Sequence, residues 1–243
     1  MQTVETISRP EQRLFALRDV RDETPDMKSF FFEPLDDRPL FTFRPGHFIN
    51  ISFADNKGLG RRSFSIASSP REGILRITVK RVRTFTSTLF ETSPGEPFEI
   101  LAPLGLPYVR DEEEDAEYVL IAGGSGIVPF RSLLHYAQET DLPQHFHLFT
   151  SCKRKKDACF HDELVALSER SANMSLVATL TQESRKGFEH GRIDTHMLTA
   201  HLSSLEKKRF IVCGPPRMVR AIIMLLRDLE VPMARIKTET WGN

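Results

Sequence analysis

The feature that most constrains the fold is the alternation of apolar strands with amphipathic helices from Tyr118 onward. A continuous apolar run, YVLIAGG at 118–124, is followed by helical spacing at 128–139. The alternation then continues, with strands expected at 145–151, 174–181, 209–214 and near the C-terminus, and helices expected at 160–170, 193–202 and 216–229. Strands that alternate with helices form βαβ units, so this part predicts a parallel sheet covered on both faces.

The chain before Pro107 has a different pattern. Short alternating apolar runs, separated by turn signals such as RPG, SPREG and SPGE, indicate strands at 15–20, 27–34, 47–53, 62–68, 74–82 and 97–103. They are typical of an antiparallel barrel or sandwich. The one helical interruption is 86–92, which Thr86 or Ser87 can cap. An acidic run at 109–117 marks the expected boundary, giving domains 1–111 and 112–243.

Composition excludes several classes of function. The 243 residues include 33 basic and 33 acidic ones, so no net field attracts nucleic acid or an anionic membrane. The longest apolar runs, such as 221–226, are too short to span a bilayer, and the N-terminus lacks an apolar signal core, so we expect a cytoplasmic protein. Three scattered cysteines predict neither a disulfide framework nor a metal or iron–sulfur site.

Two glycine-containing turns follow apolar strands. In AGGSGIVP, 122–129, the glycines allow a tight turn, and the helix that follows offers free N–H groups to a pyrophosphate. Pro129 stands where the ordinary dinucleotide fingerprint has its last glycine. In IVCGPPRMV, 211–219, Cys213 lies at the carboxyl end of a strand, where open α/β sheets bind ligands. A turn without a ligand, and a cysteine that is only a small buried hydrophobe, remain open alternatives.

The stretch RRSFS, 61–65, poses a question about a single strand. Strand side chains alternate, so Arg62 and Phe64 share one face while Ser63 and Ser65 share the other. A cation beside an aromatic ring can be a packing pair, or it can hold a flat anionic cofactor. A plain amphipathic strand is the alternative.

These motifs occur in a specific order along the chain. RSFS, AGGSGIVP, VCGPP and a final ETW resemble, in that order, the motifs of the ferredoxin–NADP reductase-like flavoprotein family, and 43–51 and 92–105 resemble two further family segments. The resemblance implies an N-terminal antiparallel β-barrel that binds FAD and a C-terminal α/β Rossmann-like domain that binds NAD(P)H. It also implies hydride transfer from nicotinamide C4 to flavin N5, followed by electron transfer onward.

The resemblance assigns roles in a flavin site. Arg62 matches the arginine on the flavin pyrophosphate, Phe64 takes the place of a stacking tyrosine, Ser65 matches a serine near N5, and Ser63 lies between them. The ring-facing role of Ser65 needs a twisted strand end, because simple alternation places it on the other face. The backbone of the next strand, at Ile77, Val79 and Lys80, is expected to pass the flavin. Ser87 and Thr88, at the start of the short helix, are expected to hold a phosphate. The family has a glycine three residues before Ser87, and this chain has Thr84 there.

The resemblance also assigns a nicotinamide site. Gly123, Gly124, Gly126 and Pro129 match the nucleotide loop, and Cys213, Gly214 and Pro215 match the CGPP motif beside nicotinamide C4. Glu239 and Trp241 match the closing E-x-aromatic pattern, with Trp241 near the flavin ring; a terminal anchor for the last strand is the alternative for this tryptophan. Catalytic roles fall on Ser65, Cys213 and Glu239.

The donor and the acceptor stay open. Basic residues after the second and third strands, Lys153, Arg154 and Arg185, suit the 2′-phosphate of NADPH, although NADH-using relatives have a similar 180–194 segment and solvated basic runs are common. No iron–sulfur pattern is present, so a separate ferredoxin, flavodoxin or oxygenase component is expected to take the electrons. Lys80, Arg81 and Arg83 are candidates for an acidic partner's dock.

Four other readings compete with this one. They are a flavin-binding electron-transfer subunit of a larger complex, a free flavin or quinone reductase, a nicotinamide dehydrogenase without flavin, and a binding module that has lost its cofactors. The barrel half and RSFS argue against a flavin-free dehydrogenase, and the intact glycines argue against loss of cofactor binding.

Overall fold

The computed structural model describes residues 7–55, 57–109 and 116–240. Their contacts define two compact units. The first holds the described residues up to Val109 together with Val128–Glu139, and the second holds those from 116 to Ile127 and from Thr140 onward. The predicted boundary between 111 and 112 lies outside the described residues and stays a prediction. None of the helices in the described part of the chain combines the length and apolar character needed to cross a membrane.

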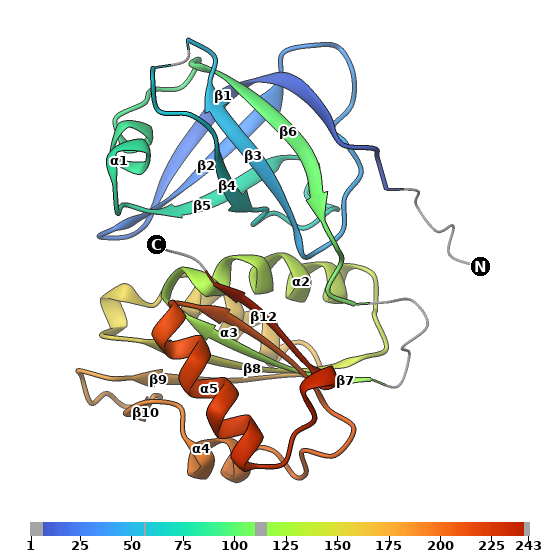
Figure 1. Cartoon of the computed structure of the whole chain (residues 1–243), viewed down its shortest axis with the longest axis vertical. Helices are drawn as coiled ribbons and strands as arrows, with labels where there is room; N and C mark the ends of the chain where they lie inside the picture. Colours follow the sequence, from blue (N-terminus) through green and yellow to red (C-terminus); the bar gives the residue numbers. More distant parts are fainter. Residues whose placement is uncertain (1–6, 56, 110–115, 241–243) are drawn as a thin grey trace. The chain divides into compact units, whose positions relative to one another are not determined.

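The first unit is built on an antiparallel sheet with the strand order β4-β3-β6-β1-β2-β5 (Figure 1). Each strand lies at a run predicted from the period-two alternation of apolar residues. The two edge strands, β4 and β5, meet at the bridge between Ile66 and Ile77, so the sheet curls back on itself as the predicted barrel requires. The strands are β1 (Glu11–Thr24), β2 (Met27–Pro34), β3 (His47–Phe53), β4 (Arg62–Ser65), β5 (Leu75–Lys80) and β6 (Pro97–Gly105).

Phenylalanine fills the core of this sheet. Phe98 is fully buried, and its ring centroid lies 5.3 Å from that of Phe32 and 4.9 Å from that of Phe53. Rings at such spacings add specific edge-to-face attraction to the burial of large apolar area. The same cluster contains Ile77 and Phe85, which border the candidate flavin site.

Two helices belong to the first unit, α1 (Thr84–Phe90) and α2 (Val128–Glu139). Helix α1 begins before the predicted start at Thr86. Its N-cap residue is Arg83, so the predicted cap at Thr86 or Ser87 is wrong; the Thr86 hydroxyl lies inside the first turn and accepts the amides of Val82 and Arg83 at 2.9 and 3.0 Å. Helix α2 has the predicted limits, and Pro129 lies in its first turn, where no N–H is needed.

The second unit contains a parallel sheet with the strand order β10-β9-β8-β7-β11-β12. From β7 the chain proceeds outward to β8 and β9 on one side, and then returns to β11 and β12 on the other. The order therefore reverses between β7 and β11, and open α/β sheets bind ligands at such a switch point. The strands are β7 (Glu117–Gly123), β8 (His145–Cys152), β9 (Met174–Leu180), β11 (Arg209–Gly214) and β12 (Ile236–Thr240), with a two-residue β10 (Glu189–His190) that the sequence did not predict.

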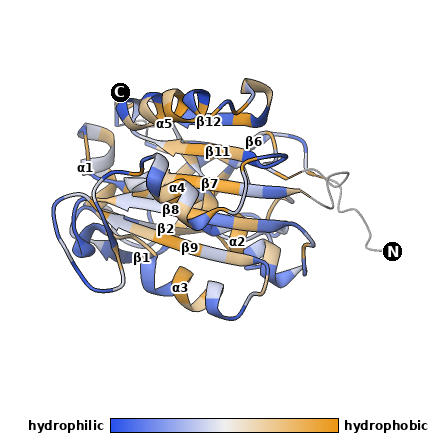
Figure 2. Cartoon of the chain, turned by 90° about the horizontal axis from the view of Figure 1, so that it is seen from below, coloured by the Kyte–Doolittle hydropathy of each residue, from blue (hydrophilic) through white to orange (hydrophobic). Residues whose placement is uncertain are grey.

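Helices cover both faces of this sheet, as predicted. Helices α4 (Thr195–His201) and α5 (Pro216–Asp228) pack on the face that carries Val119, Ile121 and Val212. Helix α3 (His161–Glu169) lies on the opposite face. In Figure 2 the hydrophobic colouring follows the central strands, while the hydrophilic colouring follows the loops. The continuous apolar runs of the parallel strands reflect this burial on two sides.

The amino ends of three neighbouring strands are joined by charge. The Lys208 ammonium, which is buried, contacts the Glu117 carboxylate, and His147 Nε2 lies 3.3 Å from the same group. Lys208 is the main cause that lowers the pKa of Glu117. Burial lowers the pKa of His147 despite the nearby carboxylate. This cluster lies at the end of the sheet opposite the switch point.

Candidate functional site

Strand β4 presents the four RSFS residues at the edge of the first unit. Arg62 and Ser63 are exposed, Phe64 is half-buried and Ser65 is buried. The Ser63 hydroxyl donates to Asn50 Oδ1 on β3 at 2.6 Å, which occupies it within the sheet. Arg62 has no carboxylate partner among the described residues, and its Nη1 donates only to the neighbouring carbonyl of Arg61. An exposed guanidinium without a carboxylate is free to bind an anion.

Arg62 and Phe64 meet at a third residue that the sequence did not single out. The Arg62 guanidinium lies 5.7 Å from the Phe85 ring centroid, and the Phe64 ring lies 6.0 Å from the same centroid. The two side chains therefore share a face, as the alternation predicted, and they form a packing group with α1. Phe85 is the first aromatic residue of α1, and that position was its only signal in the sequence.

The other residues predicted for the flavin site divide into two groups. The side chains of Ile77 and Val79 point into the core, so only their backbone can meet a cofactor, as expected. Lys80 is paired with Asp26 at 3.0 Å. Ser87 and Thr88 lie in the middle of α1 and not at its start: the Ser87 amide donates to Arg83 O at 2.8 Å, and the Thr88 hydroxyl donates to Thr84 O.

The two glycine turns of the second unit touch each other at the switch point. A Cβ added to Gly126 would lie 2.0 Å from the carbonyl oxygen of Cys213, and one added to Gly123 would lie 2.1 Å from Met218 Sδ. A Cβ added to Gly214 would lie 3.1 Å from the backbone nitrogen of Gly123, which is a tight contact but not a clash. Gly124 differs, because its φ is +53° and nothing lies within 4 Å of its Cβ position. Its open side suits a ligand that approaches the backbone.

Cys213 lies near the end of β11, whose neighbours in the sheet are β7 and β12. It is fully buried and pairs in register with Ala122 on β7 and with Glu239 on β12. Parallel register therefore brings the two predicted residues Cys213 and Glu239 side by side. Pro215 is exposed and is the N-cap residue of α5. Trp241 lies outside the described residues, so its predicted role stays a prediction.

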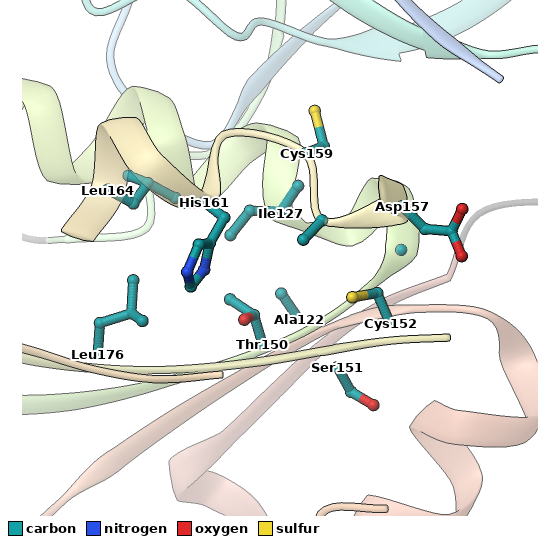
Figure 3. Close-up of a pocket in the computed structure, with 12 residues that line it drawn as sticks. Ala122, Ile127, Thr150, Ser151, Cys152, Asp157, Cys159, His161, Leu164 and Leu176 are labelled. Atoms are coloured by element: carbon teal, nitrogen blue, oxygen red, sulfur yellow. The ribbon is translucent and has the colours of Figure 1, made fainter. Parts of the chain in front are cut away.

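A small hollow opens beside Gly124 at the carboxyl ends of β7 and β8. Its volume is about 20 Å³, close to that of one water molecule, so it is too small to enclose an aromatic ring. Figure 3 shows His161 pointing into it from the start of α3, between Leu176 and Thr150. The hollow extends the open side of the glycine turn toward the loop after β8, and that loop contributes Asp157, Ala158 and Cys159 to its lining.

Basic side chains surround the same end of the sheet. Lys153 and Arg154 follow β8, are exposed, and have no ion-pair partner among the described residues. The backbone joins the two predicted loops, because Gln182 N donates to Lys153 O at 2.9 Å and Lys155 N donates to a Glu183 carboxylate oxygen at 2.9 Å. Arg185 lies 3.6 Å from Glu183, so its charge is partly balanced.

An aromatic pair beside these basic residues was not predicted. The His161 and Phe188 rings stack with centroids 4.4 Å apart and planes 26° apart. Burial and the neighbouring Lys155 lower the pKa of His161, which favours the neutral imidazole. The two residues are far apart in sequence, and only the meeting of the β8 and β9 loops brings them together. They give this end of the site a flat, uncharged surface.

The chain thus combines an antiparallel barrel-like unit with a parallel α/β unit whose two glycine turns lie at the switch point. Residues 120–223 match the family model of the oxidoreductase NAD-binding domain. That segment runs from β7 into α5 and contains both glycine turns.

Curated proteins and solved structures agree with this fold. The chain is 28% identical over 231 residues to the gamma subunit of sulfhydrogenase 2 from Pyrococcus furiosus, covering 90% of this chain and 79% of that protein. It is 27% identical over 242 residues to ferredoxin–NADP reductase B from Sorangium cellulosum, covering 95% and 97%. A ferredoxin NADP⁺ reductase from Neisseria gonorrhoeae, solved with bound FAD and NADP, superposes with a TM-score of 0.78 at 22% identity, covering 94% and 98%.

These findings confirm the resemblance to ferredoxin–NADP reductase-like FAD/NAD-binding oxidoreductases. The NAD-binding domain model over 120–223 and the names of these relatives agree with the predicted class, an FAD-dependent NAD(P)H oxidoreductase, and with its two predicted cofactors. The fold is confirmed by the structure itself. The roles of single residues stay predictions.

Proposed function

We propose that the chain passes a hydride from NAD(P)H to FAD and then delivers electrons to a separate protein acceptor. The observation that supports this most directly is the pair of touching glycine turns at the switch point between β7 and β11. This arrangement of the two turns places the open side of Gly124 and the buried Cys213 at the same end of the sheet. Open α/β sheets bind nucleotides at that end.

The residues present fit the two cofactors. Bound FAD would accept the hydride and release electrons one at a time. Arg62, exposed and without a carboxylate, would bind its pyrophosphate, and Phe64, supported by Phe85, would stack on its ring. Ser65, which is buried and carries a hydroxyl, would hold a proton-donating hydrogen bond near the reacting nitrogen.

NAD(P)H would be held by backbone and by charge. The turn Gly123–Gly126 and the start of α2 would receive the pyrophosphate, and Lys153, Arg154 and Arg185 would face the adenosine ribose and any 2′-phosphate. Cys213 would lie beneath the position of the nicotinamide ring, with Glu239 beside it in register. The buried position of Cys213 suits packing and not nucleophilic attack.

The acceptor is proposed to be an acidic electron-carrier protein. Of the three candidate docking residues, Lys80 is paired with Asp26, and Arg81 lies 3.7 Å from Glu91. Arg83 is exposed at the start of α1 and has no carboxylate partner among the described residues. The dock therefore centres on Arg83, with Lys80 and Arg81 available once their exposed partners are exchanged.

A second candidate function is a flavin-binding subunit of a larger redox complex. It is favoured by the similarity to the sulfhydrogenase gamma subunit, of which this chain covers 79%. Both functions use the same two cofactor sites. They differ in whether the isolated chain reduces a free carrier protein.

An anaerobic absorption experiment tests the proposal. Purified protein that carries flavin is titrated with NADPH and separately with NADH, and then mixed with an acidic [2Fe–2S] ferredoxin. We expect flavin bands that bleach with at least one nucleotide and recover as ferredoxin is reduced. Bleaching without ferredoxin reduction would favour the subunit function. A colourless protein that takes up no added FAD would overturn the assignments of Arg62, Phe64 and Ser65.

A further inference from the structure

Helix α2 contains an arginine that is buried among the residues of the first unit. Arg131 is 5% exposed, and its Nη1 donates to the carbonyl oxygen of Ala67 at 2.8 Å and to Glu72 Oε1 at 2.7 Å. Both partners lie in the segment between β4 and β5. Burying a guanidinium is costly unless it is paired and hydrogen-bonded, so this one is held in a defined place.

Two further contacts fasten the same segment to α2. The fully buried Ser132 hydroxyl donates to Ser68 O at 2.7 Å, and the Ser69 hydroxyl contacts the Glu139 carboxylate at the other end of the helix. Glu72 also accepts the amide of Ser69 at 2.9 Å. The segment Ala67–Glu72 is therefore fastened to the helix through Arg131 and Ser132 near its start and through Glu139 at its end.

This segment continues directly from the flavin strand. Ala67 follows Ser65 by two residues, and its amide donates to Arg76 O on β5 at 2.7 Å. The adjacent Ile66 makes the bridge that brings β4 to β5. A shift of Ala67 would therefore move the end of β4 that carries Phe64 and Ser65.

Helix α2 also continues directly from the glycine turn. Its first residue, Val128, follows Ile127, the last residue of the turn Gly124–Ile127. Arg131 and Ser132 lie in its first two turns. The helix that follows the glycine turn in the sequence is thus the one that holds the segment after β4 by buried hydrogen bonds.

We propose that Arg131 is a positioning residue for hydride transfer. Through Ala67 and Glu72 it sets the end of β4, and with it the Ser65 hydroxyl. This inference rests on the proposed function, because it concerns the alignment of that same reaction. Misplacement of reacting groups by about 1 Å from a distant change can cost about a hundredfold in rate.

The test compares Arg131→Met and Arg131→Lys with a matched control. Arg13 is also buried in the first unit, and its guanidinium also holds a carboxylate, Asp36, and loop carbonyls, those of Arg38 and Pro39. Arg13→Met therefore removes a comparable buried group away from the flavin strand. The readouts are the FAD dissociation constant, the flavin absorption band, and the rate of flavin reduction at saturating NADPH or NADH.

With saturating FAD, we expect Arg131→Met to slow flavin reduction about tenfold and to shift the flavin band, because Glu72 loses its guanidinium partner and a released Ala67 relaxes the strand end. Arg131→Lys should recover part of the rate. Arg13→Met should lose thermal stability while its reduction rate stays within about twofold of the wild type.

Two outcomes separate the failures. Wild-type protein that neither nucleotide bleaches would overturn the proposed function. A wild type that bleaches, beside an Arg131→Met variant with an unchanged band and rate, would overturn only this inference. If Arg131→Met does not fold, Ser132→Ala, which loses just the bond to Ser68 O, takes its place and is expected to slow reduction about threefold.

Discussion

Gly124 and Gly126 differ in role although only one residue separates them. A Cβ on Gly126 would enter the backbone of Cys213, whereas one on Gly124 would meet open space at a positive φ. We expect Gly126→Ala to cost about 3 kcal/mol of folding free energy through overpacking. Gly124→Ala should cost about 1 kcal/mol through backbone strain, and should raise the KM for NAD(P)H, because its methyl group occupies the open side.

Thermal unfolding and steady-state kinetics on both alanine variants check this pair. A stable Gly126→Ala protein with normal nucleotide binding would contradict the close contact between the two turns. A Gly124→Ala protein with an unchanged KM would show that the nucleotide lies elsewhere.

Ser65 is the residue predicted to contribute a hydrogen bond near the reacting flavin nitrogen. Ser65→Ala keeps the strand and its burial but removes the hydroxyl, so we expect flavin reduction to slow about tenfold, as the loss of one hydrogen bond allows. Anaerobic stopped-flow absorption measures the rate. Ser63→Ala is the matched control, because that hydroxyl is bonded to Asn50 on the neighbouring strand. Equal rates for wild type and Ser65→Ala would remove Ser65 from the mechanism.

The half-exposed Cys152 is expected to be unreactive despite its accessibility. Burial raises the pKa of its thiol to about 11. The thiolate is the nucleophile, so alkylation by iodoacetamide should be slow at pH 7 and should accelerate up to about pH 11. Mass spectrometry of the labelled protein measures this rate, and Cys159 and Cys213, both buried, serve as internal controls. Fast labelling of Cys152 at pH 7 would contradict the raised pKa.

Local sequence patterns identified the residues of the glycine turns and of RSFS, but not the residues that contact distant parts of the chain. The glycines and Cys213 lie at the ends of apolar strands, and RSFS forms a short strand of its own, so these positions could be predicted. Phe85, the His161–Phe188 pair and Arg131 act through neighbours that are distant in sequence, and no local periodicity reports such contacts. Ser87 and Thr88 were placed at a helix start because a hydroxyl at Thr86 resembles a cap, although the helix begins at Thr84.

At the scale of the elements, the amino ends of β7, β8 and β11 are joined by the Lys208–Glu117–His147 cluster. Glu117 has a lowered pKa in the folded state, so its stabilisation is present above its unfolded pKa of about 4.3 and is lost as pH falls through the lower folded value. His147 also has a lowered pKa, so protons bind the unfolded state first below about pH 6.5. Both groups make the protein less stable in acid.

Urea unfolding between pH 3 and pH 8 measures this effect. We expect His147→Gln to flatten the decline between about pH 7 and pH 5, and Glu117→Gln to flatten it below about pH 4.3. Parallel curves for the wild type and both variants would show that the cluster does not set the acid response.

Strands were predicted more closely than the short elements. Long apolar runs with flanking turns leave little choice of structure, and all the larger strands and helices of the second unit appear near their predicted positions. The two-residue β10 has no periodicity to read. Helix α3 begins after Phe160, which has a positive φ of 59° that no bulky residue prefers, so its start reflects packing and not propensity.

At the scale of the whole molecule, each unit has its own hydrophobic core. Phe98→Ala should therefore destabilise the first unit by about 3–5 kcal/mol and release flavin at a temperature at least about 10 °C lower. Phe146→Ala, an equally buried change in the second unit, should lower the melting of the sheet while disturbing flavin release less. Flavin fluorescence and far-UV circular dichroism, followed together on heating, distinguish the two. Identical shifts in both signals would mean that the units unfold as one.

The contact of the two glycine turns has a consequence for recombination between relatives. No side chain separates Gly126 from Cys213, so the backbone of each turn packs directly on the other and their shapes must match. In a chimera with β7 from one parent and β11 from another, the two turns would come from different proteins and would not fit each other. Such a chimera would fail to fold unless both turns were taken from the same parent. The loops after β8 and β9 carry exposed basic side chains and do not have to match the two glycine turns in this way. The loops that are proposed to select NADH or NADPH can therefore be exchanged between relatives, whereas the two glycine turns have to be inherited together.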